Sequence, residues 1–220
     1  RQETAADSGS SSPTVVDSDN EEDASTPEEV RPGLHWSSLH GFNKKGWLQS
    51  NTVDVYIDLI RTRAKEGFGY SERCLFLSSH SKDICDPPGG INSNTPLRPV
   101  VRLLEAALKA MKLQASEVHM IFVPFYTPAH WTLLVLDYQQ NRARVLDSLK
   151  GGWSQWSSSY KRVTRNLASG LHAIARTEQD KKKLLPMTTC TPECEEDYPQ
   201  QTDGNACGVF LLNGVDSLAG

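Results

Sequence analysis

A cysteine near the end of the chain follows a polar, turn-forming stretch and opens an apolar run. Residues 199–206 read PQQTDGNA, Cys207 comes next, and residues 209–212 read VFLL. This pattern predicts a loop that delivers Cys207 to the first turn of a buried helix, where free backbone N–H groups and the helix dipole favour a thiolate. Cys207 is therefore a candidate nucleophile. A cysteine simply buried after a glycine turn explains this stretch equally well, because free cysteine is among the most buried residue types.

A thiol nucleophile needs a base, and the base needs a group that orients it. Among the six histidines, His130 stands out because the sequence PAHW at 128–131 places it where a loop enters an apolar strand. Asp147 is a carboxylate inside the apolar segment 145–149, and a charge there is costly unless it is paired. Pairing of the two segments as a hairpin brings Asp147 back towards His130. A lone histidine at a strand end is more often structural, so the interpretation depends on all three residues together.

Acyl transfer also requires donors for the negative charge that develops on the carbonyl oxygen. The backbone N–H of Cys207 at a helix start is one candidate donor. The side-chain amide of Gln201, six residues earlier, is a second. Trp47 precedes a predicted helix, where it either packs in the core or lines a groove.

Hydrophobic periodicity predicts the elements that position these residues. Apolar residues at helical spacing predict helices at about 51–65 with Ser50 as the N-cap, from Thr95-Pro96 to about 112, and at about 157–176. Apolar runs predict strands at 74–77, 117–125, 131–138 and 143–149, of which the last two form a hairpin. Loops are expected at 86–90 and at the lysine run 181–183.

Residues 1–31 differ in composition from the rest of the chain. They are rich in Ser, Asp, Glu, Thr and Pro and contain scarcely any large apolar residue, so they cannot bury enough surface to offset the entropy of ordering. We expect a disordered acidic tail at 1–31 and one domain at 32–220. Residues 1–30 carry a net charge of −8, which leaves +4 on the rest because the whole chain carries −4. A body of that sign attracts acidic protein surfaces, although excess lysine also occurs on ordinary solvated faces.

Cysteine usage and hydropathy limit the class of protein. The five cysteines are an odd number, which argues against a disulfide framework and favours a reducing compartment. No apolar run approaches the roughly 20 residues of a membrane-spanning helix. The start also lacks the pattern of a secretory signal, although the chain begins at Arg1. We therefore expect an intracellular protein of the nucleus or cytoplasm that is a monomer and binds neither nucleic acid nor a membrane.

A metal site on Cys190 and Cys194 would need two more ligands at suitable positions. The sequence offers only scattered candidates. The two cysteines are therefore interpreted as ordinary loop residues, and no metal is expected.

Four segments become specific when they are taken together and in order. They are Trp47-Leu48 before a helix, HWTLLVLD at 130–137, VLDSL at 145–149, and QQTDGNACGVF at 200–210. In this combination the chain resembles the ubiquitin-like-protein-specific protease family, the SUMO-deconjugating, sentrin-specific-like cysteine proteases with a papain-like triad. The four segments cover most of residues 34–216.

The resemblance implies a fold class and a role for each candidate residue. The implied fold is α+β and papain-like, with a small central mixed sheet flanked by helices. Cys207 is then the nucleophile, His130 the general base and later the acid, Asp147 the residue that orients His130, and Gln201 the oxyanion donor.

The resemblance also implies that Trp47 and Trp131 form the two walls of a narrow tunnel. Two indoles can clamp a Gly-Gly tail, which has no side chains, and exclude anything larger. The implied partners are SUMO or a related ubiquitin-like protein and its conjugates, and no cofactor is implied.

Three positions depart from the usual pattern of this family. Asp203 replaces the usual Asn, while Ala206 and Ser50 each replace the usual Asp. Asp203 before a glycine is interpreted as a turn former, although a carboxylate near the oxyanion would oppose the developing charge. The chain also stops at Gly220, where relatives usually continue with more helix, so truncated C-terminal support is an expectation.

These residues favour a thiol isopeptidase or endopeptidase that cleaves after the C-terminal Gly-Gly of a ubiquitin-like modifier through a thioester. Two alternatives stay open: an acyltransferase with the same triad, and a catalytically inactive module that binds a modifier. The sequence shows no recognisable site for an acyl-coenzyme, and it retains all four chemical residues, so the hydrolase is favoured.

Overall fold

The structure is a computed structural model that describes residues 47–67, 72–88, 97–149 and 152–220. All of these residues belong to one compact unit, Pro32–Gly220. The expected acidic tail at 1–31 and the expected helix start at Thr95-Pro96 lie outside the described residues.

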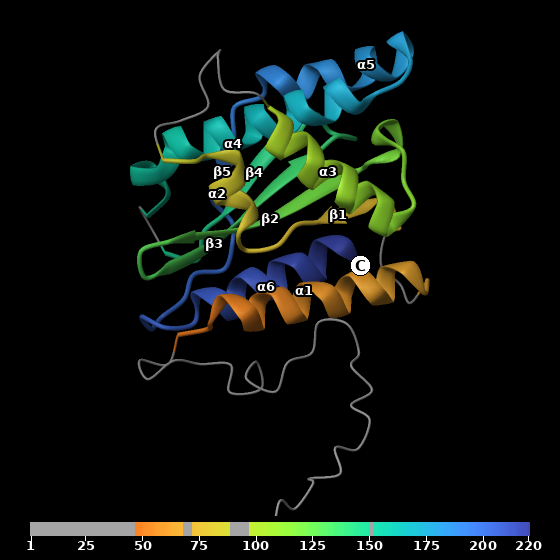
Figure 1. Ribbon diagram of the computed structural model, residues 1–220. Helices are drawn as coiled ribbons and strands as arrows, with labels where there is room; N and C mark the ends of the chain where they lie inside the picture. The colour runs from red at the N-terminus through yellow and green to blue at the C-terminus, as the bar shows by residue number, and fades with distance from the viewer. Residues whose placement is uncertain (1–46, 68–71, 89–96, 150–151) are drawn as a thin grey trace, which may run out of the picture. The chain divides into compact units, whose positions relative to one another are not determined.

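Five strands form one mixed sheet in chain order (Figure 1). The central strands β2, β3 and β4 are antiparallel, whereas the outer strands β1 and β5 run parallel to their neighbours. The strands are β1 Cys74–Phe76, β2 Met120–Thr127, β3 His130–Asp137, β4 Arg142–Leu146 and β5 Glu193–Cys194. The expected hairpin of the third and fourth strands is confirmed.

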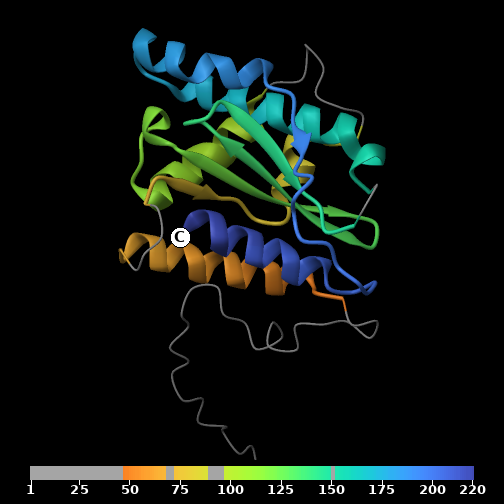
Figure 2. The same cartoon turned by 180° about the vertical axis from the view of Figure 1, so that it is seen from behind.

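Helices cover both faces of this sheet. One face carries α1 (Ser50–Lys65) and α6 (Cys207–Ala219), which lie side by side although they are far apart in the chain (Figures 1 and 2). The other face carries α2 (Ser81–Cys85), α3 (Arg98–Met111) and α4 (Gly152–Ile174). Because both faces are covered, β3 is buried along its whole length. The expected α+β class, with a mixed sheet flanked by helices, is therefore confirmed.

Helix α1 follows from its apolar stripe but begins differently from the prediction. Val53, Ile57, Ile60 and Ala64 are buried on one face, as helical spacing requires. The predicted N-cap is wrong, because Gln49 has the extended backbone of a cap and Ser50 is already the first helical residue. Leu48 is fixed in an isolated β-bridge, so the chain turns into the helix one residue earlier.

Three other boundaries differ from the prediction by three residues or more. The second strand begins at Met120 rather than at 117, because Ala115–Glu117 form a 3-10 turn closed by a capping box between Gln114 and Glu117. Strand β4 ends at Leu146, so Asp147 lies just beyond the sheet. Helix α4 begins at Gly152 rather than near 157, and its first turns place Trp153 and Trp156 against the core.

The lysine run at 181–183 is helical, so the prediction of a loop there was wrong. It forms the last turn of α5 (Glu178–Leu184), which is followed by a 3-10 turn at Leu185–Thr189. The side chain of Thr177 caps the helix by accepting the N–H of Asp180. Acidic residues in the first turn and lysines in the last turn both interact favourably with the helix dipole, which stabilises this short helix.

Candidate active site

Three candidate residues meet at one end of the sheet. His130 is the first residue of β3, Asp147 is the first residue after β4, and Cys207 is the first residue of α6. The register Leu133 to Leu146 brings the start of β3 beside the end of β4, and α6 packs against β3. All three side chains are buried.

His130 and Asp147 form a buried hydrogen-bonded pair. The Nε2 atom of His130 lies 2.7 Å from Oδ1 of Asp147. The same oxygen accepts the backbone N–H of Leu149 at 2.9 Å, which fixes the carboxylate. A hydrogen bond with an ionised partner is among the strong ones. Since Nε2 is engaged with the carboxylate, the buried Nδ1 is the ring nitrogen available to a thiol.

The surroundings of Cys207 and His130 favour an ion pair between them. Burial alone would raise the pKa of Cys207, but the His130 side chain and the backbone N–H groups of Trp131 and Gly208 outweigh burial and lower this pKa. Burial alone would lower the pKa of His130, but Asp147 and Cys207 outweigh it and raise this pKa from 6.5 to about 9. Between the two pKa values, Cys207 is a thiolate and His130 is protonated.

The pH dependence of Cys207 alkylation is expected to reveal this ion pair. The rate with iodoacetamide should first rise well below the ordinary thiol pKa of 9.0, because the pKa of Cys207 is lowered, and should rise again near pH 9, where His130 loses its proton. Mass spectrometry that maps the alkylated residues at each pH measures this profile. His130→Ala should move the first rise to higher pH.

Cys190 and Cys194 serve as internal controls in the same experiment. Both are half-buried, and burial raises the pKa of each. They should react only in alkaline solution. A Cys207 profile that coincides with theirs would contradict the ion pair.

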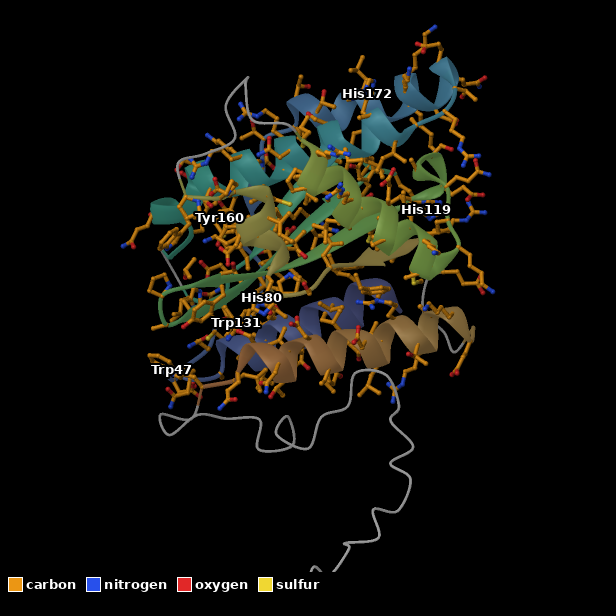
Figure 3. All side chains as sticks on the ribbon, in the orientation of Figure 1. Trp47, His80, His119, Trp131, Tyr160 and His172 are labelled. Atoms are coloured by element: carbon orange, nitrogen blue, oxygen red, sulfur yellow. The ribbon has the colours of Figure 1, made fainter. Side chains whose placement is uncertain are left out.

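Cys207 is one of the residues that line a pocket of about 260 Å³, and several of the others are aromatic. The lining includes Trp47, Tyr126 and Trp131 as well as Leu48 and Cys207. Figure 3 shows that Trp47 and Trp131 lie at the same end of the molecule, near the start of α1. The structure therefore brings both predicted tunnel residues together beside the candidate nucleophile.

Each tryptophan is fixed by its indole N–H. Trp131 donates to the backbone carbonyl of Leu48 at 3.0 Å, and its ring lies 4.8 Å from that of Tyr126 between centroids. Trp47 donates to Oδ1 of Asn205 at 2.6 Å, in the loop that precedes Cys207. Trp131 is thus tied to the residue that follows Trp47, and Trp47 is tied to the loop before Cys207.

Close backbone approach explains the glycine after Cys207. A Cβ atom at position 208 would lie 2.7 Å from Cβ of Leu48, a separation that real Cβ atoms essentially never show. Gly208 therefore lets Leu48 pack directly against the first turn of α6.

Gln201 lies in the loop before Cys207, and its side-chain amide is engaged at both ends. Its Oε1 atom accepts the hydroxyl of Ser148 at 2.6 Å, and its Nε2 atom donates to the backbone carbonyl of Asp203 at 2.6 Å. Its neighbour Gln200 donates to the backbone carbonyl of Asp147 at 3.0 Å. The two glutamines together tie this loop to the end of β4.

Asp203 acts as a turn former, as expected from the glycine that follows it. Its Oδ1 atom accepts the backbone N–H groups of Asn205 and Ala206, each at 2.8 Å. The carboxylate thus closes the turn that leads into α6.

Four residues of this site were missed in the sequence. The two-residue turn at 128–129 pairs Tyr126 with Trp131 across β2 and β3, so a hairpin register read back from His130 would have found Tyr126. Ser148, Gln200 and Asn205 carry no signal of their own, because their contacts depend on how distant segments meet.

Neither a metal-binding cluster nor a membrane-spanning helix is found within the described ranges. No group of three or more His, Cys, Asp or Glu residues among 47–67, 72–88, 97–149 and 152–220 is placed to hold a metal ion. In the same ranges, no helix combines the length and the apolar character needed to cross a membrane.

Comparisons with known sequences identify relatives of this chain. Ubiquitin-like-specific protease ESD4 of Arabidopsis thaliana is 27% identical over 183 residues, which are 81% of this chain and 33% of that protein. Sentrin-specific protease 2 of Homo sapiens is 22% identical over 173 residues, which are 79% of this chain and 26% of that protein. The chain thus spans about a quarter to a third of the length of these two relatives.

Solved structures share the fold. One is a structure of the SUMO protease Ulp1 with its catalytic cysteine oxidised to a sulfonic acid. The superposition includes 83% of this chain and 72% of the Ulp1 chain, with a TM-score of 0.60 and 17% identity. A second is the Xanthomonas campestris effector XopD bound to ubiquitin, and its superposition includes 91% of this chain and 83% of the XopD chain, with a TM-score of 0.52 and 19% identity. At these identities the likeness shows the fold alone.

A family model matches most of the chain. The model of the C-terminal catalytic domain of the Ulp1 protease family matches residues 46–219, which contain every residue of the site described above. The chain therefore belongs to the Ulp1 protease family and carries its catalytic domain.

Proposed function

We propose that this chain is a thiol protease that cleaves after the C-terminal Gly-Gly of SUMO or a related ubiquitin-like modifier. The observation that carries the proposal is the buried pair of His130 and Asp147 beside Cys207, which lines a pocket together with Trp47 and Trp131. Ulp1 has been solved in complex with Smt3, the yeast orthologue of SUMO, and XopD has been solved bound to ubiquitin. These two structures support a ubiquitin-like partner for this chain.

The proposed reaction begins with attack of the Cys207 thiolate on the glycyl carbonyl carbon. The protonated His130 then gives its proton to the departing amine, which is a lysine side chain in a conjugate or a peptide N-terminus in a precursor. The modifier remains as a thioester on Cys207. A water molecule that loses its proton to His130 attacks this thioester and releases the modifier with a free carboxylate.

Negative charge on the carbonyl oxygen needs donors that are already in place. The backbone N–H of Cys207 qualifies, because the first N–H groups of a helix have no partner within the helix. The Nε2 group of Gln201 is the second proposed donor.

The aromatic walls account for selectivity towards glycine. Trp47, Tyr126 and Trp131 line the same pocket of about 260 Å³ as Cys207. A tail of two glycines brings its carbonyl carbon to the thiol without any side chain to accommodate. A larger residue would have to displace an indole that is held by a hydrogen bond.

A panel of modifier probes tests this proposal. SUMO, ubiquitin and their relatives, each with an electrophile in place of the C-terminal carboxylate, are incubated with the purified chain. At least one should form a covalent adduct at Cys207, and the matching modifier fusion should be cleaved after Gly-Gly. Cys207→Ala should abolish both. Tight binding of a modifier without an adduct or cleavage would instead indicate a modifier-binding module. A chain that neither binds nor reacts with any of the modifiers would overturn the proposal.

The hydrogen bond between Trp47 and Asn205 is expected to contribute to substrate binding. Trp47→Phe keeps an aromatic wall but removes the N–H donor, and Asn205→Ala removes the acceptor. Each should raise KM about threefold to tenfold with little change in kcat, because a net hydrogen bond contributes about 0.5–1.5 kcal/mol. Steady-state kinetics on a modifier fusion measures this change.

A double variant and a matched control complete this test. Trp47→Phe combined with Asn205→Ala should raise KM no further than either single change, because both remove the same contact. Asn213→Ala, at an exposed position of α6, should leave KM unchanged. Additive effects of the two changes would show that the contact is not their common cause.

A further inference from the structure

Two hydrogen bonds join the residue after Asp147 to the loop before Cys207. The Ser148 hydroxyl donates to Oε1 of Gln201 at 2.6 Å, and the Gln201 backbone N–H donates to the Ser148 carbonyl at 2.9 Å. Ser148 is buried, with 2% of its surface exposed, whereas Gln201 is half-buried. The side-chain contact links positions 53 residues apart in the chain.

The contact with Asp203 determines which way the Gln201 amide faces. Nε2 of Gln201 donates to the backbone carbonyl of Asp203 at 2.6 Å. A carbonyl oxygen can only accept, so a flipped amide would place two oxygens against each other at that distance. In the orientation present, the amide oxygen meets the donor on Ser148 and the amide nitrogen meets the acceptor on Asp203.

Among the described residues, one N–H of the Gln201 amide has no hydrogen-bond acceptor. A primary amide carries two N–H groups, and the Asp203 carbonyl takes one of them. The second remains for another acceptor. A donor that is already oriented stabilises developing charge without reorganisation during the reaction, which is what an oxyanion site requires.

We propose that Ser148 is a positioning residue that acts through Gln201. Its hydroxyl holds the amide oxygen, so that the second N–H stays available to the oxygen of the tetrahedral intermediate. The last torsion of a glutamine side chain is broad and roughly two-fold, so an amide without this hydrogen bond samples other orientations. The inference rests on the proposed function, in which Gln201 is the oxyanion donor.

A purely structural role for Ser148 makes a different prediction. In that case the Ser148 hydroxyl only provides a hydrogen bond for a buried polar atom. Loss of the hydroxyl would then lower the free energy of unfolding without acting through Gln201. The two roles are separated by whether the loss of kcat requires the Gln201 side chain.

The experiment is a double-mutant cycle on the full chain with a cleavable modifier fusion. Gln201→Ala should lower kcat by about 10²- to 10³-fold, the usual loss for one oxyanion donor. Ser148→Ala should lower kcat about tenfold with KM within about twofold, because it loosens this donor without removing it. In the Gln201→Ala background, Ser148→Ala should have no further effect on kcat.

Two further readouts accompany the cycle. Ser148→Thr keeps a hydroxyl and should retain most of the kcat that Ser148→Ala loses. The rate of Cys207 alkylation at neutral pH should be the same in Ser148→Ala and in the unchanged chain, since the pair of Cys207 and His130 does not involve Ser148. Thermal unfolding checks that each variant is folded, and the cycle with Gln201→Ala decides the question even if the threonine does not fit.

The possible results point in distinct directions. If Ser148→Ala has an unchanged kcat, or loses kcat equally with and without the Gln201 side chain, the positioning role is overturned while the proposed function stands. If the unchanged chain is folded, has a reactive Cys207 and still cleaves no modifier fusion, the proposed function fails and the positioning role fails with it.

Discussion

Asp147→Asn is expected to lower kcat/KM by about 10²- to 10⁴-fold, the range that general acid–base catalysis supplies. The geometry should survive, because an asparagine oxygen can still accept from His130 Nε2 and from the Leu149 N–H, which both meet Oδ1 in the structure. The negative charge is lost, however. Since Asp147 is a main cause of the raised pKa of His130, this pKa should fall, and the thiolate of Cys207 loses its paired cation.

Steady-state kinetics and the pH profile of Cys207 alkylation together test this effect. In Asp147→Asn, the alkylation step near pH 9 should move to lower pH, because His130 releases its proton more easily without the carboxylate. The first rise should move to higher pH, because the thiolate is less stabilised. An unchanged pH profile together with an unchanged kcat/KM would show that the carboxylate does not act on His130.

Asp137→Asn is a matched control for this change. Asp137 is also a buried carboxylate at the end of a strand, with 1% of its surface exposed. Its Oδ1 atom accepts the backbone N–H groups of Gln139 and Gln140, in the turn between β3 and β4, and its Oδ2 atom lies 3.7 Å from the guanidinium of Arg144. Replacement of Asp137 should lower the free energy of unfolding but leave the pH profile of Cys207 alkylation unchanged. The comparison separates the general effect of losing a buried charge from the specific effect of losing the charge of Asp147.

Gly208→Ala is expected to lower both stability and activity. An alanine Cβ would overlap Leu48, whose Cβ and Cδ2 atoms lie 2.7 and 3.0 Å away, so α6 or Leu48 must shift. Overpacking of this kind costs about 1–3 kcal/mol, which exceeds the gain of about 1 kcal/mol or less from the better helix propensity of alanine. The shift would also move Cys207 and the carbonyl that holds Trp131.

The expected loss in kcat/KM is about 10²-fold, because a displacement of about 1 Å at a reacting group costs that much. Urea unfolding and kinetics on the same preparation measure both effects. Gly204→Ala is the matched control, since an added Cβ there meets no atom within 4 Å. If Gly208→Ala matches Gly204→Ala in stability and activity, the close contact with Leu48 is not important.

The candidate site was predictable where its residues lie at the ends of periodic segments. Cys207 opens an apolar run, His130 begins one, and Asp147 is a carboxylate inside another, so a hairpin and a helix start were enough to bring them to one end of the sheet. The resemblance to the protease family, carried by these same segments, implied the α+β class. These features depend on local order in the chain, which periodicity reports directly.

Contacts between distant segments could not be predicted in the same way. Nothing in the sequence indicates that Ser148 meets Gln201, or that Asn205 meets Trp47, because each contact depends on how the loop before α6 settles against two other segments. The cap of α1 was misplaced for the same reason, since the bridge at Leu48 is a tertiary feature. The helix at Glu178–Leu184 was missed because a run of three lysines is typical of a solvated loop, and the capping role of Thr177 was not recognised.

The nucleophile and the groups that activate it lie on different elements, and this has a consequence for oxidative damage. Cys207 is on α6, whereas His130 begins β3 and Asp147 directly follows β4. The thiol is therefore acidified only while α6 is docked, and any opening that releases this helix returns it to an ordinary thiol that is mostly protonated at neutral pH. The thiolate is the form that peroxides oxidise, so release of α6 removes the acidity that makes Cys207 reactive, while it exposes a side chain that is only 2% exposed in the folded chain. Docking of α6 thus both activates the thiol and shields it from bulk peroxide.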